Sequence, residues 1–293
     1  MARSFKKLAL LALLGGMGAF AAAVSSRAFA YQWSLSHCPP RPLLLKASVT
    51  GIAGLHDVEF ESERGVVIHG WQTEARNHAT VILAHGSDAN RAQLVPEARV
   101  LAEAGFGILA FDWPGQGESG GRSEWGRAER AALEAAVSYL DRHGDLERGR
   151  LGAFGYSFGG VYVAQVAAQD PRVRAVALCA TPNDLDDLRR WEHRRWGLLS
   201  QQSGLLAAHL IYGENRALEP ASVIPRLAPR PLLLIEGTAD QTVPQFMTQA
   251  LFAAAREPKS LYVVAGAQHD TFNQVAPDAY PRRLREFFER ALL

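Results

Sequence analysis

The chain has 293 residues, enough for one large α/β domain or two small domains. Because 48% of the residues are hydrophobic, the sequence can form a sizeable core. The formal net charge of +1 gives no basic footprint for nucleic acid or for an anionic membrane surface. The two cysteines make no disulfide framework, and ligand spacings such as C-x-x-C or H-E-x-x-H do not occur. We therefore expect no metal and no cofactor.

Residues 1–30 have the pattern of an export signal or of a membrane anchor. Three basic residues within the first seven precede the uncharged apolar run Leu8–Val24, and Ala28-Phe29-Ala30 is an A-x-A cleavage site. The apolar run is also marginally long enough to span a bilayer. A signal peptide cleaved after Ala30 and a retained anchor both remain open, and either places the protein in the cell envelope. The Pro-containing residues 31–55 are expected to form an extended connector.

Strand-like and helix-like segments alternate through residues 56–293. Strands are expected at 57–61, 66–73, 79–84, 107–111, 151–154, 173–179, 231–235 and 260–265, and helices at 91–104, 124–142, 160–168, 244–256 and 275–293. This alternation predicts an α/β fold with a mostly parallel sheet and helices on both faces. Residues 183–228 carry no strand signal, and we expect them to form a short helical cap over the sheet.

The segment Gly155-Tyr156-Ser157-Phe158-Gly159 stands between an apolar strand and a stretch with helical spacing. A serine with glycine two positions to either side, at a strand-to-helix junction, is the pattern of a nucleophile elbow. The strained turn pushes the serine hydroxyl clear of the backbone, so the flanking positions cannot carry bulky side chains. A Gly-Ser turn in a loop would have the same pattern, but the flanking strand and helix favour a nucleophile.

A serine hydroxyl reacts only when a base takes its proton and an acid orients that base. In this architecture the chain order is serine, then acid, then histidine. His269 follows the last strand, in a loop that can carry it over the serine, and is the predicted base. His193 and His209 lie in the insert, where a packed or solvated role is expected.

Asp240 is the predicted acid. It follows strand 231–235, which places it at the carboxyl end of a strand, on the same edge of the sheet as Ser157. Asp184 is a competing carboxylate because it follows the preceding strand. Asp270 also competes, although neighbouring side chains diverge and it is adjacent to the predicted base. Asp240 could alternatively serve as an N-cap for the helix that follows.

The negative charge that develops on a substrate oxygen requires two backbone N–H donors. The N–H of Phe158, directly after the serine, is one candidate. The other is expected from the loop after strand 79–84, where His85-Gly86-Ser87 offers the N–H of Ser87. We expect His85 to order this loop by hydrogen bonding rather than to act as a base.

The motifs of the chain then resemble a known family. They are Gly-x-Ser-x-Gly at 155–159, His-Gly at 85–86, Asp-x-x-Gly-x-Gly-x-Ser at 112–119, Gly-x-x-Asp-x-x-Val-Pro at 237–244 and Gly-x-x-His at 266–269. Their order along the chain, over roughly residues 57–291, resembles that of the α/β-hydrolase superfamily. Within it they resemble the serine aminopeptidase-like and membrane-anchored esterase-like group. The resemblance implies an eight-stranded, mostly parallel sheet, the triad Ser157, Asp240 and His269, and a structural rather than catalytic role for Asp112.

Together these features predict a serine hydrolase that cleaves an acyl bond of a small-molecule substrate, most simply a carboxylic ester, through an acyl-enzyme. A peptidase or amidase would use the same residues and differ in its pocket and leaving group. A non-catalytic binding protein could keep the fold, but it would be expected to have lost a triad residue. Relatives that use an aspartate nucleophile are disfavoured because the elbow carries Ser157.

Overall fold

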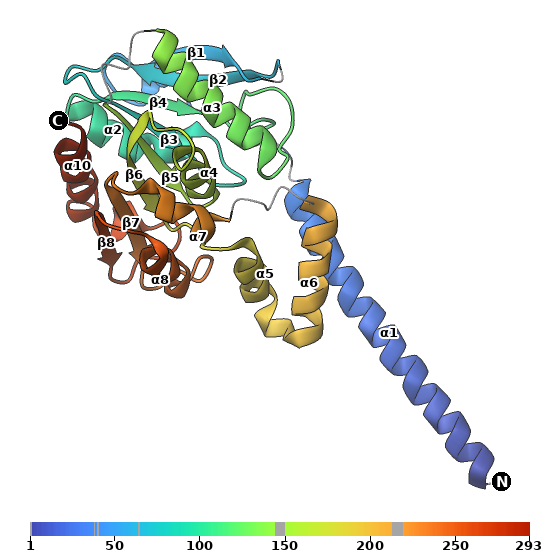
Figure 1. Cartoon of the computed structure of the whole chain (residues 1–293). Helices are drawn as coiled ribbons and strands as arrows, with labels where there is room; N and C mark the ends of the chain where they lie inside the picture. The colour runs from blue at the N-terminus through green and yellow to red at the C-terminus, as the bar shows by residue number, and fades with distance from the viewer. Residues whose placement is uncertain (1, 38, 40, 64, 144–149, 213–218) are drawn as a thin grey trace. The chain divides into compact units, whose positions relative to one another are not determined.

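The computed structural model describes residues 2–37, 39, 41–63, 65–143, 150–212 and 219–293, with the side chains of 2–13 and 36 left out. The chain divides into two compact units (Figure 1). Unit 1 is formed by Met1–Cys38 with Asp186–Glu214, and unit 2 by Pro39–Leu185 with Asn215–Leu293. We describe each unit by itself.

Unit 2 is built on one eight-stranded sheet. Its strands are β1 (His56–Glu61), β2 (Val67–Thr73), β3 (Thr80–Ala84), β4 (Gly107–Phe111), β5 (Leu151–Tyr156), β6 (Val173–Cys179), β7 (Leu232–Gly237) and β8 (Lys259–Val264). Their order across the sheet is β1-β2-β4-β3-β5-β6-β7-β8. The β1–β2 and β2–β4 pairs are antiparallel, and the remaining pairs are parallel. The predicted α/β class and the eight-stranded, mostly parallel sheet are confirmed.

Helices cover both faces of this sheet (Figure 1). On one face, α2 (Val95–Glu103) and α10 (Ala279–Leu292) pack against each other and against the central strands. A second layer is formed by α3 (Arg127–Arg142), α4 (Phe158–Ala167), α7 (Pro220–Val223) and α8 (Gln245–Ala254). Short 3₁₀ helices precede β1 (η1, Ala47–Val49) and α2 (η2, Arg91–Leu94), and a third follows α7 (η5, Ile224–Leu227).

Buried apolar residues lie on both faces of the sheet, and one large cluster lies between the central strands and the α2–α10 layer. All five residues of β3 are buried, as its continuous apolar run predicts for a strand covered on both faces. Val81 and Leu83 of β3 belong to the same buried cluster as Leu101 of α2 and Phe288 of α10. Burial of each such side chain contributes about 1.5–3 kcal/mol relative to an exposed position. These contacts hold α2 and α10 against the sheet.

The last predicted helix, 275–293, begins only at Ala279 in the structure, and a separate short helix precedes it. The short α9 (Phe272–Val275) ends at Ala276, whose φ of −131° and ψ of 61° are not helical, and α10 begins at Ala279. Pro277 explains the break, because a proline disfavours the helical conformation of the residue before it.

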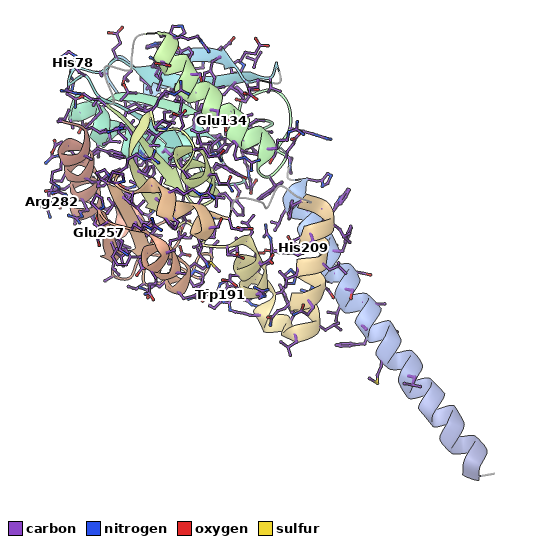
Figure 2. All side chains as sticks on the ribbon, viewed as in Figure 1. His78, Glu134, Trp191, His209, Glu257 and Arg282 are labelled. Carbon is purple, nitrogen blue, oxygen red and sulfur yellow. The ribbon has the colours of Figure 1, made fainter. Side chains whose placement is uncertain are left out.

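Unit 1 is helical. It contains α1 (Ala2–Ser36), α6 (Gly197–Tyr212), the short η3 (Arg194–Trp196) and α5, which runs from Leu185 at the boundary between the units to His193. Figure 2 labels Trp191 on α5 and His209 on α6. No strand occurs among the described residues of the insert, as predicted. The helix α1 packs along α6.

The N-terminal helix corrects the prediction of an extended connector from residue 31. The helix continues past Ala30 to Ser36, because the first proline comes only at position 39 and because Ala28 and Gln32 are buried. Within the described part of the chain, no helix is both long enough and apolar enough to cross a membrane. The side chains of the basic residues before Leu8 lie outside the described residues.

Side chains from distant parts of the sequence interlock in unit 1. Buried His193 accepts a hydrogen bond at Nε2 from the Gln32 amide (3.2 Å) and lies 3.0 Å from Ser200 Oγ through Nδ1. The hydroxyl of Tyr212 donates to the Gln32 carbonyl oxygen (3.1 Å). The Arg27 guanidinium carbon lies over the Trp196 ring, 5.0 Å from the ring centroid. The packed role expected for His193 is therefore what the structure shows, and its partner is the N-terminal helix.

Candidate active site

Ser157 occupies the sharp turn between β5 and α4. Its φ of +52° and ψ of −122° put it in a region that non-glycine residues rarely occupy. The turn is held because the Ser157 N–H donates to the Cys179 carbonyl oxygen of the neighbouring strand (2.8 Å). Ser157 is therefore a strained residue at the carboxyl end of a central strand, as the elbow pattern predicts.

Two glycines of the motif leave the room that the turn needs. A Cβ on Gly159 would collide with the carbonyl oxygens of Ala84 and His85, and a Cβ on Gly155 would collide with the backbone of Gly160. The elbow can therefore approach the end of β3 only because these positions carry no side chain.

The structure brings the three predicted triad residues together. His269 Nε2 lies 3.1 Å from Ser157 Oγ, and His269 Nδ1 lies 2.8 Å from Asp240 Oδ2. The two loops that carry the acid and the base are tied to each other, because the Ala239 N–H donates to the Ala267 carbonyl oxygen (3.0 Å). Residues more than 100 positions apart thus form one continuous hydrogen-bonded chain.

Asp240 has two sets of partners. Its Oδ2 faces His269, while its Oδ1 accepts the N–H groups of Thr242 and Val243, both at 2.8 Å. The carboxylate therefore also stabilises the turn before α8, which combines the predicted acid with a role close to the capping alternative. Of the two competing carboxylates, Asp270 has an exposed side chain and Asp184 a half-buried one. The hydrogen bond of His269 Nδ1 goes to Asp240.

His85 orders the loop after β3, as predicted. Its Nδ1–H donates to the Gly86 carbonyl oxygen (2.7 Å), and its Nε2 accepts the Trp113 N–H (3.2 Å). The Trp113 indole N–H donates to the His85 carbonyl oxygen (2.8 Å). Complete burial lowers the pKa of His85 to about 4, so the imidazole is neutral at physiological pH. A neutral imidazole with a hydrogen bond at each nitrogen is suited to holding the loop and not to proton transfer.

The predicted oxyanion donors belong to the elbow and to the loop after β3. Phe158 is the first residue of α4 and directly follows Ser157. Gly86 approaches Ser157 closely, since a Cβ placed on it would lie 3.4 Å from Ser157 Cβ. The Gly86 N–H itself donates to Gln93 Oε1 (2.8 Å), so the neighbouring N–H of Ser87 remains the candidate on this loop.

Asp112 is buried beneath the loop that follows β4. It forms an ion pair with the buried guanidinium of Arg91, and its two oxygens accept the N–H groups of Arg91 (2.7 Å) and Glu118 (3.0 Å). The Arg91 guanidinium also lies over the Trp71 ring, 4.8 Å from its centroid. The contacts of Asp112 are those of a structural residue, in agreement with the expectation from the family resemblance.

Sequence reasoning missed two residues beside the site. Gln93 lies on η2 and holds Gly86 through its side-chain oxygen, and no motif could have indicated it.

Trp125 packs edge-on against Phe158 with the ring centroids 5.0 Å apart, and it adopts a φ of +53°. The Glu129 carboxylate holds this turn by accepting from Ser123 Oγ (2.6 Å) and from the Gly126 N–H (2.7 Å). The available signal was Trp125-Gly126 followed by Glu129, an acid three positions after the glycine.

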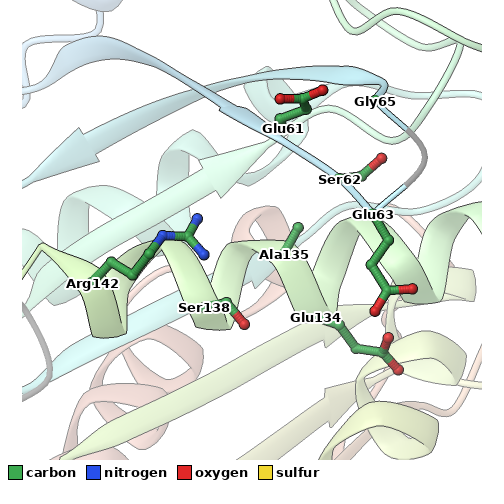
Figure 3. Close-up of a pocket in the computed structure, with 8 residues that line it drawn as sticks. All are labelled: Glu61, Ser62, Glu63, Gly65, Glu134, Ala135, Ser138 and Arg142. Carbon is green, nitrogen blue, oxygen red and sulfur yellow. The ribbon is translucent and has the colours of Figure 1, made fainter.

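A cavity of about 580 Å³ lies elsewhere in unit 2, between the β1–β2 hairpin and α3 (Figure 3). Its lining includes Glu61, Glu63, Glu134 and Arg142, and none of the predicted site residues. Burial and the nearby Glu63 raise the pKa of Glu134. Among the described residues, no group of three or more His, Cys, Asp or Glu is arranged to hold a metal ion.

The sheet order, the strained elbow and the helices on both faces define an α/β hydrolase. The family model described as the alpha/beta hydrolase fold matches residues 79–216. The chain is also 30% identical to the uncharacterized protein YfhR of Escherichia coli O157:H7 over 249 residues, covering 80% of this chain and 81% of that protein. It is 30% identical to the uncharacterized protein Rv2307c of Mycobacterium tuberculosis, covering 86% of each. The chain belongs to the α/β-hydrolase family.

Solved structures share the fold at low sequence identity. The esterase Pf2001 of Pyrococcus furiosus has a TM-score of 0.72 and 23% identity, and the match covers 87% of this chain and 98% of that one. The esterase domain of a Rhodothermus marinus protein has a TM-score of 0.59 and 22% identity, with 80% of this chain and 99% of that one covered.

Proposed function

We propose that this protein is a serine hydrolase that cleaves carboxylic esters through an acyl-enzyme. Ser157 is the nucleophile, His269 the general base and acid, and Asp240 the residue that orients and stabilises the imidazole. The observation that supports this proposal best is the pair of hydrogen bonds from Ser157 Oγ to His269 Nε2 (3.1 Å) and from His269 Nδ1 to Asp240 Oδ2 (2.8 Å). Membership of the α/β-hydrolase family supports it further.

The proton transfers follow from the tautomer that these contacts favour. With Nδ1–H donating to Asp240, Nε2 of His269 is the acceptor for the Ser157 hydroxyl proton. As Oγ forms a bond to the ester carbonyl carbon, its proton moves to Nε2, and the imidazolium is stabilised by the Asp240 carboxylate. The carbon–alkoxide bond then breaks, and the alkoxide leaves as an alcohol with the proton from Nε2.

The acyl-enzyme is released by the same groups. Nε2 takes a proton from a water molecule, whose oxygen bonds to the acyl carbon. The bond from that carbon to Oγ breaks, Ser157 recovers its proton from Nε2, and a carboxylic acid is released. In both halves the carbonyl oxygen becomes negatively charged, and the N–H groups of Phe158 and Ser87 are the proposed donors to it.

The direct test is covalent labelling by a fluorophosphonate probe together with turnover of p-nitrophenyl esters. The wild-type protein should label, and Ser157→Ala should lose labelling and about 10⁴- to 10⁶-fold of kcat. Ser222→Ala, an exposed serine on α7, is the matched control and should behave as wild type. Labelling that persists in Ser157→Ala would refute the proposed nucleophile.

The ester class is tested separately from the nucleophile. A peptidase or amidase would use the same three residues but release an amine, which is a poorer leaving group than an alcohol. The presence of esterases among solved structures with this fold supports testing esters first. A series of p-nitrophenyl esters of increasing acyl length, compared with aminoacyl amides, should show higher kcat/KM on esters. Higher kcat/KM on the amides would reassign the reaction.

A further inference from the structure

Glu97 is a buried carboxyl group that the proposed reaction does not use. It lies on α2, is 4% exposed, and its Oε1 accepts two side-chain hydrogen bonds. One comes from Asn273 Nδ2 (2.8 Å) and the other from the Tyr280 hydroxyl (2.9 Å). Burial raises the pKa of Glu97, and the two donors partly oppose this rise. Burying a carboxyl group is costly unless it is hydrogen-bonded, and the two donors supply such bonds.

Asn273 connects Glu97 to the loop that carries His269. It lies on α9, which begins three residues after His269, and the Thr271 hydroxyl oxygen accepts the Gln268 N–H (2.8 Å) at the junction. The loop is anchored before His269 by buried Ala267, and the side chains of Gln268 and Asp270 on either side of His269 are exposed. The Glu97–Asn273 hydrogen bond attaches α9, which directly follows the His269 loop, to α2.

Aromatic rings connect the same region to the elbow. The His269 ring lies against Tyr156, which immediately precedes Ser157, with the centroids 5.6 Å apart. Tyr156 meets Phe272 of α9 edge-on at 6.2 Å, and Phe272 lies 5.8 Å from Tyr280. A shift of α9 would therefore move His269 relative to the residues around Ser157.

We infer that Glu97 and Asn273 form a positioning clamp, a hydrogen-bonded pair that holds the His269 loop so that Nε2 stays within reach of Ser157 Oγ. The clamp acts through His269, and this inference rests on the proposed function. The second donor to the same oxygen is the Tyr280 hydroxyl, which ties Glu97 to α10, whereas Tyr280 meets α9 through its ring, against Phe272. The two bonds to Oε1 therefore have different consequences when they are removed.

The test compares Asn273→Ala with Tyr280→Phe. A displacement of about 1 Å in a reacting group can lower a rate by about 100-fold, so Asn273→Ala should lower kcat by about 10- to 100-fold with KM within about twofold. The rate of fluorophosphonate labelling should fall in parallel. Tyr280→Phe should lower the melting temperature but keep kcat within about threefold. Gln274→Ala, an exposed neighbour on α9, is the matched control and should behave as wild type.

Substitutions of Glu97 provide a second measurement that separates positioning from stability. Glu97→Gln keeps an oxygen that can accept from Asn273 and should retain most of kcat, whereas Glu97→Leu should resemble Asn273→Ala. An Asn273→Ala variant that labels at the wild-type rate would overturn the clamp. The clamp would also be overturned if Asn273→Ala and Tyr280→Phe lost equal amounts of kcat and these losses scaled with the decrease in melting temperature. A wild-type protein that neither labels nor turns over esters would instead overturn the proposed function itself.

Discussion

At the residue scale, Asp240 shows how one carboxylate serves the chemistry and the fold together. Its Oδ2 faces His269 Nδ1, and its Oδ1 accepts two N–H groups of the turn before α8. An asparagine keeps the oxygen for the turn but loses the charge that stabilises the imidazolium and the acceptor that selects its tautomer.

We therefore predict that Asp240→Asn folds with near-normal stability and loses about 10⁴-fold of kcat. Asp270→Asn is the matched control, because Asp270 is adjacent to His269 and exposed. That variant should stay within about threefold of wild type. Steady-state kinetics with a p-nitrophenyl ester and thermal unfolding check both statements. An Asp270→Asn loss larger than that of Asp240→Asn would reverse the assignment of the acid.

The lowered pKa of His85 makes the free energy of unfolding depend on pH. Its pKa is about 4 in the fold, because burial disfavours the charged imidazole, against 6.5 when unperturbed. Between these values the unfolded chain binds the extra proton, so stability rises with pH there. The contribution is fully present above about pH 6.5 and is lost as the pH falls toward 4, by about 3 kcal/mol in all.

Urea unfolding at several pH values between 7.5 and 4.5 checks this prediction. The free energy of unfolding of the wild type should decrease on acidification more steeply than that of His85→Gln, which has no imidazole to protonate. The difference between the two curves isolates His85 from the other titrating groups. Parallel curves would show that burial does not depress the pKa of His85.

At the element scale, Gln32 ties α1 to both α5 and α6 within unit 1, because it bonds His193 of α5 and its carbonyl oxygen accepts from the Tyr212 hydroxyl of α6. His193 is buried, its pKa is lowered by burial, and its Nε2 accepts from the Gln32 amide. Replacing Gln32 with leucine would leave that nitrogen buried without its donor, at a cost of about 1–3 kcal/mol.

We predict that Gln32→Leu speeds amide hydrogen exchange in α6 and leaves exchange in the strands of unit 2 unchanged. Gln202→Leu, an exposed glutamine on α6, is the matched control and should exchange as wild type does. Hydrogen exchange followed by mass spectrometry measures both. Unchanged exchange in α6 of the Gln32 variant would show that α1 contributes nothing to the stability of the insert.

At the scale of the whole molecule, unit 2 holds the complete sheet and every proposed site residue. The points at which the chain leaves and re-enters it lie close together, because the Leu185 N–H donates to Glu219 Oε2 (3.0 Å) and the Ala221 N–H to the Asn183 carbonyl oxygen (2.9 Å). A short linker can therefore replace residues 186–214 without straining the sheet.

We predict that residues 39–185, linked to 215–293, fold cooperatively and label with a fluorophosphonate within about tenfold of the full-length rate. The expectation of a helical cap predicts that the dependence of kcat/KM on acyl length changes when residues 186–214 are removed. An ester series measured on both proteins checks this. An unchanged length dependence would show that these residues do not select the acyl group, and an unfolded product would show that unit 2 needs unit 1.

The sequence by itself predicted the strands, most helices, and Ser157, Asp240 and His269 as the candidates. It could do so because apolar periodicity reports burial, and because the elbow imposes steric demands on the five residues around Ser157. Only the tertiary structure decided that Asp240 rather than Asp184 faces His269, that α1 is part of the same unit as the insert, and that Glu97 reaches Asn273. Gln32 and His193 are 161 positions apart, and Glu97 and Asn273 are 176 apart. Such contacts depend on how complete elements pack, and no local pattern of residues encodes them.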